Sequence, residues 1–507
     1  MEIKQRAFPY LRIVLIAAVL LSAISTALFV HENFHNAHFD SKGHQLVARR
    51  LFDNLSPGWI QIGAFWLPLP HVLYLPFVHS DALYFSGLAG TPLSMLSFLL
   101  TVWVLFKLIE RVFGEFPAFC GSVLYLTNTN ILYLQSTALT ENLMILFMVA
   151  ATYLLVRFVQ TRNDRWLWAT SAVSALGILT RYDNWLVFGM IGLMLIVIDL
   201  IERRGMRTLL RNGFVLGCLG FTAMGVSFWI NWYTTGHIML DIRDRYMDFQ
   251  FGQGSYMLSF FVCMYTLANL VGYEWMIIGF FGFVVAFRNR FRDPVFLASL
   301  ALAGPLILYM AGYHNNHPMR IRYGLPFVAP CFVFAAYWAT RKIMIKYLFC
   351  IYIVYTSLYN PYLQRYSGEL LLESLRDANN LALQNDLLWY LRGNDDGSLI
   401  LAAMGEIAPV LYDLKLPIKR YVHEGAKPWW NDARKHPEQV VGWVFMSQGD
   451  KLWQQLHDDA EFHKHFALVG RRNYLELYRR TPDEQLNLQS HRPHGLQQKG
   501  EIPQLPL

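Results

Sequence analysis

The chain has little charge and few cysteines for its length. Only 16% of its 507 residues are charged, whereas about a quarter of a typical soluble protein is. Its 5 cysteines all lie in apolar stretches and form no CxxC pair, so the sequence indicates neither a disulfide framework nor a cysteine-based zinc site. It also has no internal repeat and no GxxxxGKS or GxxxxGKT loop, which argues against a nucleotide-driven pump.

Long apolar segments account for the missing charge. Hydrophobic residues make up 54% of the chain, and a membrane-spanning helix needs about 20 mostly apolar residues in succession. The first segment continues to Val30 and meets HENFH in place of a small-residue cleavage site, so we interpret it as an uncleaved helix. We predict about eleven spans in a polytopic α-helical membrane protein. These spans are residues 11–30, 85–106, 117–135, 141–157, 166–180, 185–201, 213–233, 274–287, 295–313, 323–340 and 345–360.

Basic residues lie between the predicted spans in a regular order. They precede the first span and follow the second, fourth, sixth, eighth and tenth, for example at Lys107, Arg157 and Arg288. Because cytoplasmic loops are rich in Lys and Arg, this order places the N-terminus and those loops in the cytoplasm. The same clusters explain the formal net charge of +7 without a nucleic-acid partner. The two long outward loops, residues 31–80 and 234–273, are expected to cover an extracytoplasmic site.

Apolar and charged stretches alternate within these outward loops. The segment WLPLPHVLYLPFV contains three prolines, so it is expected to lie along the membrane surface and not to span it. In the other long loop, residues 241–254 alternate in charge and end in two glycines, which suits either a flexible lid or an ordinary solvated loop. Residues 256–273 are interpreted as an interfacial helix at the outer surface.

The composition changes after Pro361. Residues 367–392 have the pattern of an amphipathic helix, and several short strands follow. The expected strands are SLILAA, PIKRYVH and VGWVFMS, with FALVG and YLELYRR as a final hairpin. We therefore predict a membrane domain over residues 1–360, a small extracytoplasmic α/β domain over 361–480, and a disordered tail over 481–507.

The segment HENFHNAHFDSKGHQL, just after the first span, is unusually polar. It contains Asp40 and four histidines, one of which is His44. One interpretation is a solvated loop that tolerates these charges. The other makes Asp40 a general base that removes the proton from a sugar-acceptor hydroxyl. The irregular spacing of the histidines is not a metal signature, so no metal site is assigned, although a divalent cation is left open.

Two further polar segments lie at outward ends of spans. In STALTENLMILF, Glu141 either faces the positive end of its helix behind an N-cap at Thr140, or belongs to a site. In GILTRYDNWLVF, one interpretation pairs Arg181 with Asp183 or uses Tyr182 and Trp185 as interfacial anchors. The other gives Arg181 a role in a site, because an outward arginine departs from the usual charge bias.

The segment YHNNHPMRIRYGLPFVAP lies between the ninth and tenth spans. It contains Arg320, Arg322 and Tyr323, with His317 nearby. Two outward arginines can clamp a phosphate, because a guanidinium group binds phosphate through two parallel hydrogen bonds. The alternative is that these arginines extend to lipid headgroups.

The order of several short motifs resembles the GT-C superfamily of membrane glycosyltransferases. The motifs are an Asp soon after the first helix, W-x-P-L-x-H ending at His71, T-E-N, L-T-R and R-Y-x-L-P. The similarity is to bacterial members of this superfamily that are related to protein O-mannosyltransferases and the lipid A aminoarabinose transferase, and it spans about residues 1–360. Many relatives have two adjacent acidic residues in the first loop, whereas Asp40 is followed here by Ser41. Whether Glu32, Asp53 or Glu141 supplies a second carboxylate is left open.

The resemblance implies a polyprenyl-phosphate-linked sugar donor and a bacterial inner-membrane location. In that family a first-loop acidic residue acts as the base or positions the acceptor, and Asp40 is the matching position here, with Glu141 as a second catalytic candidate. Donor and acceptor contacts are expected from the residues named above: Arg181, Arg320, Arg322, Tyr323, His44, His71 and His317. The acceptor is a glycolipid, a polysaccharide or a protein, and the transfer inverts the anomeric centre. The alternatives are a flippase for a lipid-linked saccharide, which would favour repeats and mid-depth charges that are not seen, and a non-enzymatic envelope scaffold.

Overall fold

The computed structural model describes residues 10–62, 66–238, 254–315, 317, 319–341, 347, 350–351 and 368–481. Most of the expected lid, most of the eleventh predicted span and the tail after Thr481 lie outside these residues. The chain forms two compact units. The helical unit contains Met1–Gln45 and Gly63–Arg376, and the sheet unit contains Leu46–Ile62 and Asp377–Leu507. This division falls after Arg376, whereas the sequence suggests a boundary after residue 360.

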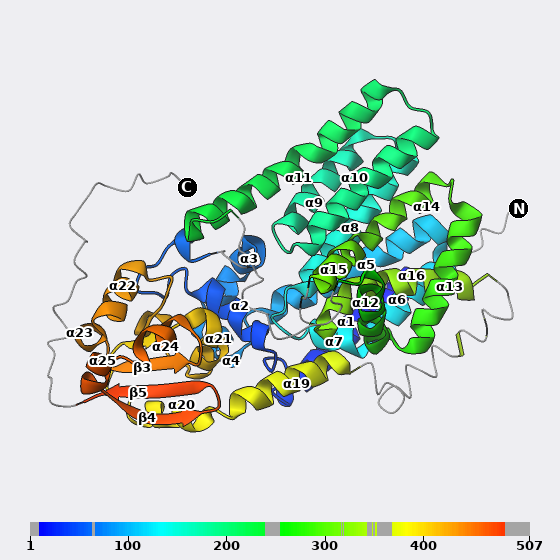
Figure 1. Cartoon of the computed structure of the whole chain (residues 1–507). Helices are drawn as coiled ribbons and strands as arrows, with labels where there is room; N and C mark the ends of the chain where they lie inside the picture. Colours follow the sequence, from blue (N-terminus) through cyan, green and yellow to red (C-terminus); the bar gives the residue numbers. More distant parts are fainter. Residues whose placement is uncertain are drawn as a thin grey trace, which may run out of the picture. The chain divides into compact units, whose positions relative to one another are not determined.

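The helical unit contains six helices that are long and apolar enough to cross a membrane, among the described residues. They are α1 (Tyr10–His31), α5 (Thr91–Phe113), α8 (Glu141–Thr161), α10 (Asp183–Ile201), α11 (Met206–Thr235) and the broken helix Pro294–His314, formed by α14 (Pro294–Ser299), η3 (Leu300–Ala303) and α15 (Gly304–His314). The helices α8, α9 (Asp164–Ile178), α10 and α11 lie side by side (Figure 1). Three predicted spans correspond to shorter helices. α9 has 15 residues, and α6 (Glu115–Thr127) is separated from α7 (Thr129–Leu134) by Asn128. The span predicted at 323–340 forms the short helix η4 (Ile321–Phe327) and the 12-residue helix α16 (Val328–Ala339).

The helix predicted at residues 256–273 is present, and it meets its successor at a sharp bend. α12 (Tyr256–Val271) and α13 (Tyr273–Arg290) pass the spanning test together but are bent by 118°. The bend falls at Gly272, whose φ of 91° lies in the left-handed region that glycine adopts readily. Counted as one span, this pair raises the number to seven in the part of the chain that the structure describes.

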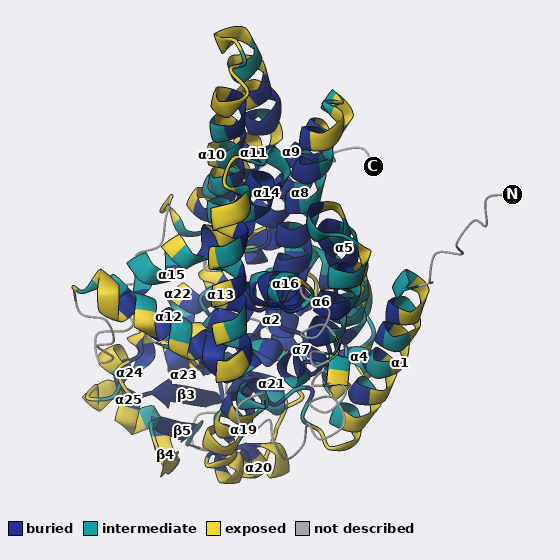
Figure 2. Cartoon of the chain, turned by 90° about the vertical axis from the view of Figure 1, so that its right-hand side faces the viewer, coloured by how far each residue is buried: buried dark blue, intermediate teal, exposed yellow. Residues whose placement is uncertain are grey.

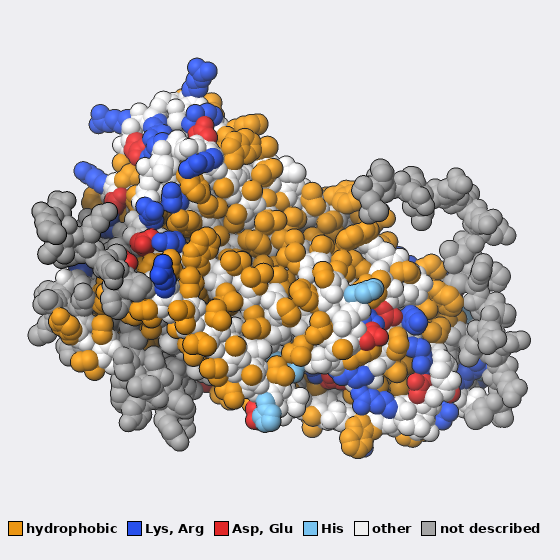
Figure 3. Space-filling view, turned by 180° about the vertical axis from the view of Figure 1, so that it is seen from behind, with side chains coloured by type: hydrophobic (Ala, Val, Ile, Leu, Met, Phe, Trp, Pro, Cys, Tyr) orange, Lys and Arg blue, Asp and Glu red, His pale blue; other side chains and the backbone are white. Residues whose placement is uncertain are grey.

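Outward-facing apolar side chains cover much of the helical unit. Leu20, Phe214, Phe221 and Trp229 each expose more than half of their surface. Buried residues fill the middle of the bundle (Figure 2), while hydrophobic side chains spread over its outside and Lys and Arg gather beyond one end (Figure 3). Such a surface suits lipid and not water. The protein is therefore a multi-pass membrane protein.

Close packing between α13 and α16 (Val328–Ala339) depends on small residues. A Cβ atom added to Gly282 would lie 2.0 Å from the carbonyl oxygen of Phe334, and one added to Gly279 would lie 2.8 Å from Cys331 Sγ. Small residues allow helix backbones to approach closely within a membrane, where lipid removes most of the hydrophobic drive for association. The glycines thus set the distance between these two helices.

We expect Gly282→Ala to destabilise the protein, because a backbone carbonyl cannot yield as a flexible side chain can. The cost of such overpacking is about 1–3 kcal/mol. Gly189→Ala on α10 is the matched control, since nothing lies within 4 Å of its added Cβ. Thermal unfolding of both purified variants in detergent measures the difference. Equal melting temperatures would contradict the packing described here.

A buried amide joins the first helix to the centre of the helical unit. Gln135, which follows α7, accepts a hydrogen bond from Ser22 Oγ at 2.8 Å and donates to Ser25 Oγ at 3.0 Å and Thr26 Oγ1 at 2.9 Å. Polar side chains hold helices together in this way where water is absent. This contact fixes the end of α1 from which the first loop departs.

The sheet unit contains five strands in the order β2-β1-β3-β5-β4. The strands are β1 (Ile400–Ala402), β2 (Tyr421–Val422), β3 (Trp443–Ser447), β4 (Phe466–Arg472) and β5 (Leu475–Arg480). β1 is parallel to β2 and β3, whereas β5 is antiparallel to β3 and β4. The predicted small α/β region and its final hairpin are confirmed, and the predicted amphipathic helix forms as α19 (Glu369–Ala382) and α20 (Asn385–Gly393). The remaining helices of this unit are α21 (Met404–Asp413), α22 (Lys427–Lys435), α23 (Pro437–Val440), α24 (Lys451–Leu456) and α25 (Ala460–His465).

Part of the first loop belongs to the sheet unit. Gln61 Nε2 donates to the Gly425 carbonyl at 2.8 Å, and Asp53 Oδ1 accepts from the Lys419 backbone N–H at 3.3 Å. Asp53 also pairs with Arg49 at 3.1 Å. Asp53 therefore fixes the loop within the sheet unit, which accounts for its charge without a role as a second catalytic carboxylate.

Candidate active site

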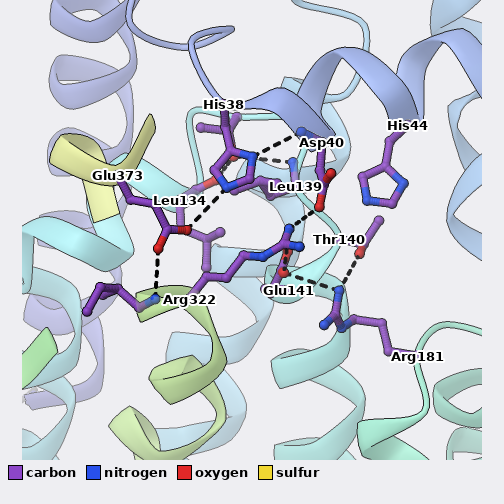
Figure 4. A network of polar contacts seen from close by, with 12 residues as sticks. His38, Asp40, His44, Leu134, Leu139, Thr140, Glu141, Arg181, Arg322 and Glu373 are labelled. Carbon is purple, nitrogen blue, oxygen red and sulfur yellow. Dashed lines mark hydrogen bonds and ion pairs between the residues drawn. The ribbon is translucent and has the colours of Figure 1, made fainter. Parts of the chain in front are cut away.

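The site is assembled from the start of the first loop and the ends of four helices. Asp40 lies in the first turn of α2 (Phe39–Arg49), and its backbone N–H donates to His38 Nδ1 at 3.0 Å. Its carboxylate forms an ion pair with Arg322 Nη1 (Figure 4). Residues more than 280 positions apart are thus brought into direct contact, which no local sequence pattern could establish.

Arg322 lies in the short helix η4 (Ile321–Phe327), ahead of α16. Its guanidinium carbon is 5.3 Å from the centre of the Tyr323 ring, and this ring stacks on Tyr309 of α15. Among the described residues, the buried Nε of Arg322 has no hydrogen-bond acceptor. The side chain is therefore held in position while retaining a donor for a further anion.

Glu141 lies at the first position of α8, with only 1% of its surface exposed. Its Oε1 is 3.1 Å from Arg181 Nη1 and 3.7 Å from Arg322 Nη1. Thr140 Oγ1 accepts a hydrogen bond from Arg181 Nη1 at 3.4 Å and caps no backbone N–H of the helix. Of the two sequence interpretations of this segment, the geometry favours a site over a helix cap.

Arg181 occupies the turn between α9 and α10. Besides Glu141, it contacts Asp183, with 3.0 Å between Nε and Oδ2, which is one of the alternatives that the sequence left open. Asp183 also accepts a hydrogen bond from the Tyr309 hydroxyl at 2.5 Å. Negative and positive side chains consequently alternate through the site. The order is Asp40, Arg322, Glu141, Arg181 and Asp183.

The surroundings of Asp40 favour its ionised form. Burial alone would raise the pKa of this carboxyl, but the positive charge of Arg322 brings the pKa well below its ordinary value. The same ion pair holds the pKa of Arg322 well above its usual range, although burial opposes it. While this pair persists, Asp40 is an anion with little tendency to take up a proton.

Two histidines lie beside Asp40. His44 follows one turn later on α2 (Figure 4), and its Nδ1 is 3.1 Å from Nε2 of His71 in α3 (Pro68–Val78). The Trp66 ring lies over His44, with 4.1 Å between their centroids. Burial, followed by the influence of His71, lowers the pKa of His44 well below its usual value, so the ring is neutral at pH 7. His44 Nε2 is buried and has no partner among the described residues.

The other predicted site residues lie around Arg322. His317 packs edge-on against Tyr323, with 5.0 Å between ring centroids. Arg320 is exposed and its charge acts on Glu373. The structure thus brings Asp40, Glu141, Arg181 and Arg322 into one network, places Tyr323, His44 and His71 against it, and leaves His317 and Arg320 farther out.

Two polar residues of this site were missed by sequence reasoning. Tyr309 lies within an apolar span, where a tyrosine gives no signal of its own. Glu373 of α19 accepts a hydrogen bond from the Ile321 backbone N–H at 2.8 Å and lies 3.5 Å from His38. Its position within LLLESLRD, among the leucines of an amphipathic helix, was the available signal for a buried carboxylate.

The acidic groups of the site are matched by arginines. In the described ranges, no group of three or more His, Cys, Asp or Glu side chains is placed to hold a metal ion. Asp40 and Glu141 both direct their oxygens at guanidinium groups. These residues are therefore partners of arginines and do not fit a metal-binding set.

Comparison with known proteins agrees with this architecture. Residues 83–232 match the family model described as dolichyl-phosphate-mannose-protein mannosyltransferase. ArnT from Cupriavidus metallidurans, in a crystal structure bound to undecaprenyl phosphate, is 14% identical, with a TM-score of 0.57 over 92% of this chain and 98% of that one. The archaeal oligosaccharyltransferase AglB from Archaeoglobus fulgidus, in complex with an inhibitory peptide and a dolichol-phosphate, is 10% identical, with a TM-score of 0.53 over 94% of this chain and 75% of that one. No curated protein sequence matches the chain.

Proposed function

From the GT-C glycosyltransferase fold of this chain, we propose that it moves a sugar from a polyprenyl-phosphate carrier to an extracytoplasmic acceptor. The observation that carries the proposal is the pair of partly buried arginines, Arg181 and Arg322, which share the carboxylate of Glu141 beside Asp40. The basic loops favour a cytoplasmic N-terminus in a bacterial inner membrane, with this site on the outer face. The acceptor is a glycolipid, a polysaccharide or a protein.

The lipid phosphate binds at Arg322, with Arg181 as the second cation. Arg322 has a buried Nε that no described residue engages, and a guanidinium group binds phosphate through two parallel hydrogen bonds. The Tyr323 ring packs against the guanidinium group of Arg322, and His317 packs against that ring. The exposed Arg320 attracts the phosphate as it enters the site. Both cations stabilise the charge that builds on the phosphate as it leaves.

Donor binding also prepares the base. In the lipid-free protein Asp40 is neutralised by Arg322, which makes it a weak proton acceptor. When a phosphate engages Arg322, Asp40 loses part of its counter-charge and faces a new negative group. Both effects raise the pKa of a carboxyl and make it a better base. A productive base therefore appears only when the donor is present.

The transfer is a single displacement. The acceptor oxygen forms a bond to the anomeric carbon while the bond from that carbon to the phosphate oxygen breaks, and the acceptor proton passes to Asp40. One displacement inverts the anomeric centre. His44, oriented by His71, presents Nε2 to a sugar or acceptor hydroxyl. Glu141 holds the two arginines together throughout, and the phosphate leaves as polyprenyl phosphate.

The proposal is tested with the purified full chain in lipid vesicles and a panel of undecaprenyl-phosphate sugars. Mass spectrometry follows the release of undecaprenyl phosphate. We expect Arg322→Gln to reduce release at least about a hundredfold, as removal of a transition-state donor commonly does. Arg211→Gln is the control, because Arg211 pairs with Asp164 on the surface and takes no part in the site.

Two results would overturn the proposal. If Arg322→Gln and Arg211→Gln release lipid phosphate at the same rate, the arginine is not part of the chemistry. If every donor stays intact while a labelled lipid-linked saccharide crosses the vesicle membrane, the chain is a flippase and not a transferase.

A further inference from the structure

We propose that Glu373 is a positioning residue that aligns both members of the Asp40–Arg322 ion pair. Glu373 belongs to α19, which follows the membrane spans. Among the described contacts, it forms no hydrogen bond or ion pair with Asp40 or Arg322 themselves. It contacts instead one residue beside each of them (Figure 4). The inference rests on the proposed function, because alignment matters only if this pair receives the donor.

The first contact fixes the backbone beside Arg322. Glu373 Oε2 accepts the Ile321 N–H at 2.8 Å, at the start of η4, where the peptide N–H groups lack partners inside the helix. A carboxylate at this end also meets the positive end of the peptide dipoles. The backbone that leads directly into Arg322 is therefore fixed by a charged hydrogen bond.

The second contact fixes the turn that carries Asp40. His38 Nε2 lies 3.5 Å from Glu373 Oε1, and Nδ1 of the same ring accepts the Asp40 backbone N–H at 3.0 Å. Nδ1 therefore acts as the acceptor, so the ring proton is on Nε2, directed at Glu373. A carboxylate behind a histidine fixes both its tautomer and its orientation. One carboxylate thus joins the two segments whose side chains meet at the site.

Glu373 is itself firmly held. The backbone N–H of Leu370, one turn earlier, donates to Asn130 Oδ1 at 3.0 Å, and Asn130 Nδ2 donates to the Leu270 carbonyl at 3.0 Å. Leu370 is fully buried in the core of the helical unit. Glu373 has only 7% of its surface exposed, and burial alone would raise its pKa, but His38, Arg322 and Arg320 together lower the pKa, so the carboxylate remains ionised. A charged, anchored group at this point is suited to alignment and not to catalysis itself.

The test is a double-mutant cycle on the full chain in detergent, with undecaprenyl phosphate as the probe and binding followed by tryptophan fluorescence. We expect Glu373→Ala to weaken binding about tenfold when Arg322 is present and less than about twofold in an Arg322→Gln background, because coupled residues are non-additive. Ser374→Ala is the control on the same helix, since its hydroxyl donates a hydrogen bond to the Leu370 carbonyl of that helix. Thermal unfolding accompanies each variant.

Each outcome decides something. Equal weakening by Glu373→Ala in both backgrounds indicates a general structural role and overturns the inference. The inference is also overturned if Glu373→Ala binds the lipid as tightly as Ser374→Ala does while Arg322→Gln binds it poorly. If Arg322→Gln itself binds normally, the proposed function fails first. Should Glu373→Ala not fold, Glu373→Gln keeps the acceptor for Ile321 and the side-chain volume, and it must still show a loss of affinity that disappears when Arg322 is absent.

Discussion

Asp40→Asn is expected to abolish sugar transfer while it tightens the binding of polyprenyl phosphate. Transfer should fall about a thousandfold, since a positioned general base contributes about 10²–10⁴ in rate. Binding should improve about tenfold, because the carboxylate that competes with phosphate for Arg322 is gone and its repulsion disappears. These opposite effects distinguish a base that shares its cation with the donor from a residue that merely supports the fold.

The matched control is Asp81→Asn, because Asp81 is an exposed aspartate in the first turn of α4 (Asp81–Ser86). It should change neither quantity by more than about twofold, as is usual for surface substitutions. Release of undecaprenyl phosphate from a sugar donor measures turnover, and fluorescence titration with undecaprenyl phosphate measures affinity. Wild-type turnover by Asp40→Asn would refute its role as the base. Weaker lipid binding would refute the competition for Arg322.

Much of the fold was accessible from the sequence because lipid imposes strong local rules. The lengths of the apolar segments predicted the helices α1, α5, α8, α10 and α11, and the change in composition after Pro361 predicted the small α/β region that contains the sheet. Local rules did not predict features in which a glycine or a polar side chain contacts groups that are distant in the sequence. The bend at Gly272 and the packing at Gly282 depend on what lies opposite each residue, and no single-sequence pattern records that.

The site shows the same division between local and distant information. Asp40 and Arg322 stood out because charge at the outer edge of an apolar span is unusual. Their contact, however, joins the first loop to a helix near the end of the bundle. For Glu141 the sequence allowed a helix-cap environment, because Thr140 can act as an N-cap and an acidic residue in the first turn faces the positive end of a helix. Only the three-dimensional arrangement shows that its partners are Arg181 and Arg322.

Glu141→Gln is expected to destabilise the lipid-free protein strongly, and undecaprenyl phosphate should restore much of the loss. Glu141 is almost fully buried between Arg181 and Arg322. Loss of one member of a buried charge network costs about 3–5 kcal/mol, here because the two arginines lose the carboxylate that they share. The two arginines would then repel each other, and Asp183 and Asp40 would each neutralise only one of them.

The phosphate supplies the missing negative charge. A ligand that binds only the folded state stabilises it by about 2.7 kcal/mol at a concentration 100 times its Kd. The lipid should therefore raise the melting temperature of Glu141→Gln by more than it raises that of the wild type. Neutral lipids of the same chain length should give no such difference, since the effect depends on the anion.

Glu476→Gln provides the matched control for this experiment. Glu476 is also a buried carboxylate with charged partners, Arg471 and His457, but it belongs to the sheet unit. Its loss should lower the melting temperature too, and undecaprenyl phosphate should then raise that temperature by no more than in the wild type. If the lipid stabilises both variants equally, the phosphate does not bind between Arg181 and Arg322. If Glu141→Gln is as stable as the wild type without lipid, the shared carboxylate does not hold the arginines together, and the cation pair must be balanced by Asp40 and Asp183 alone.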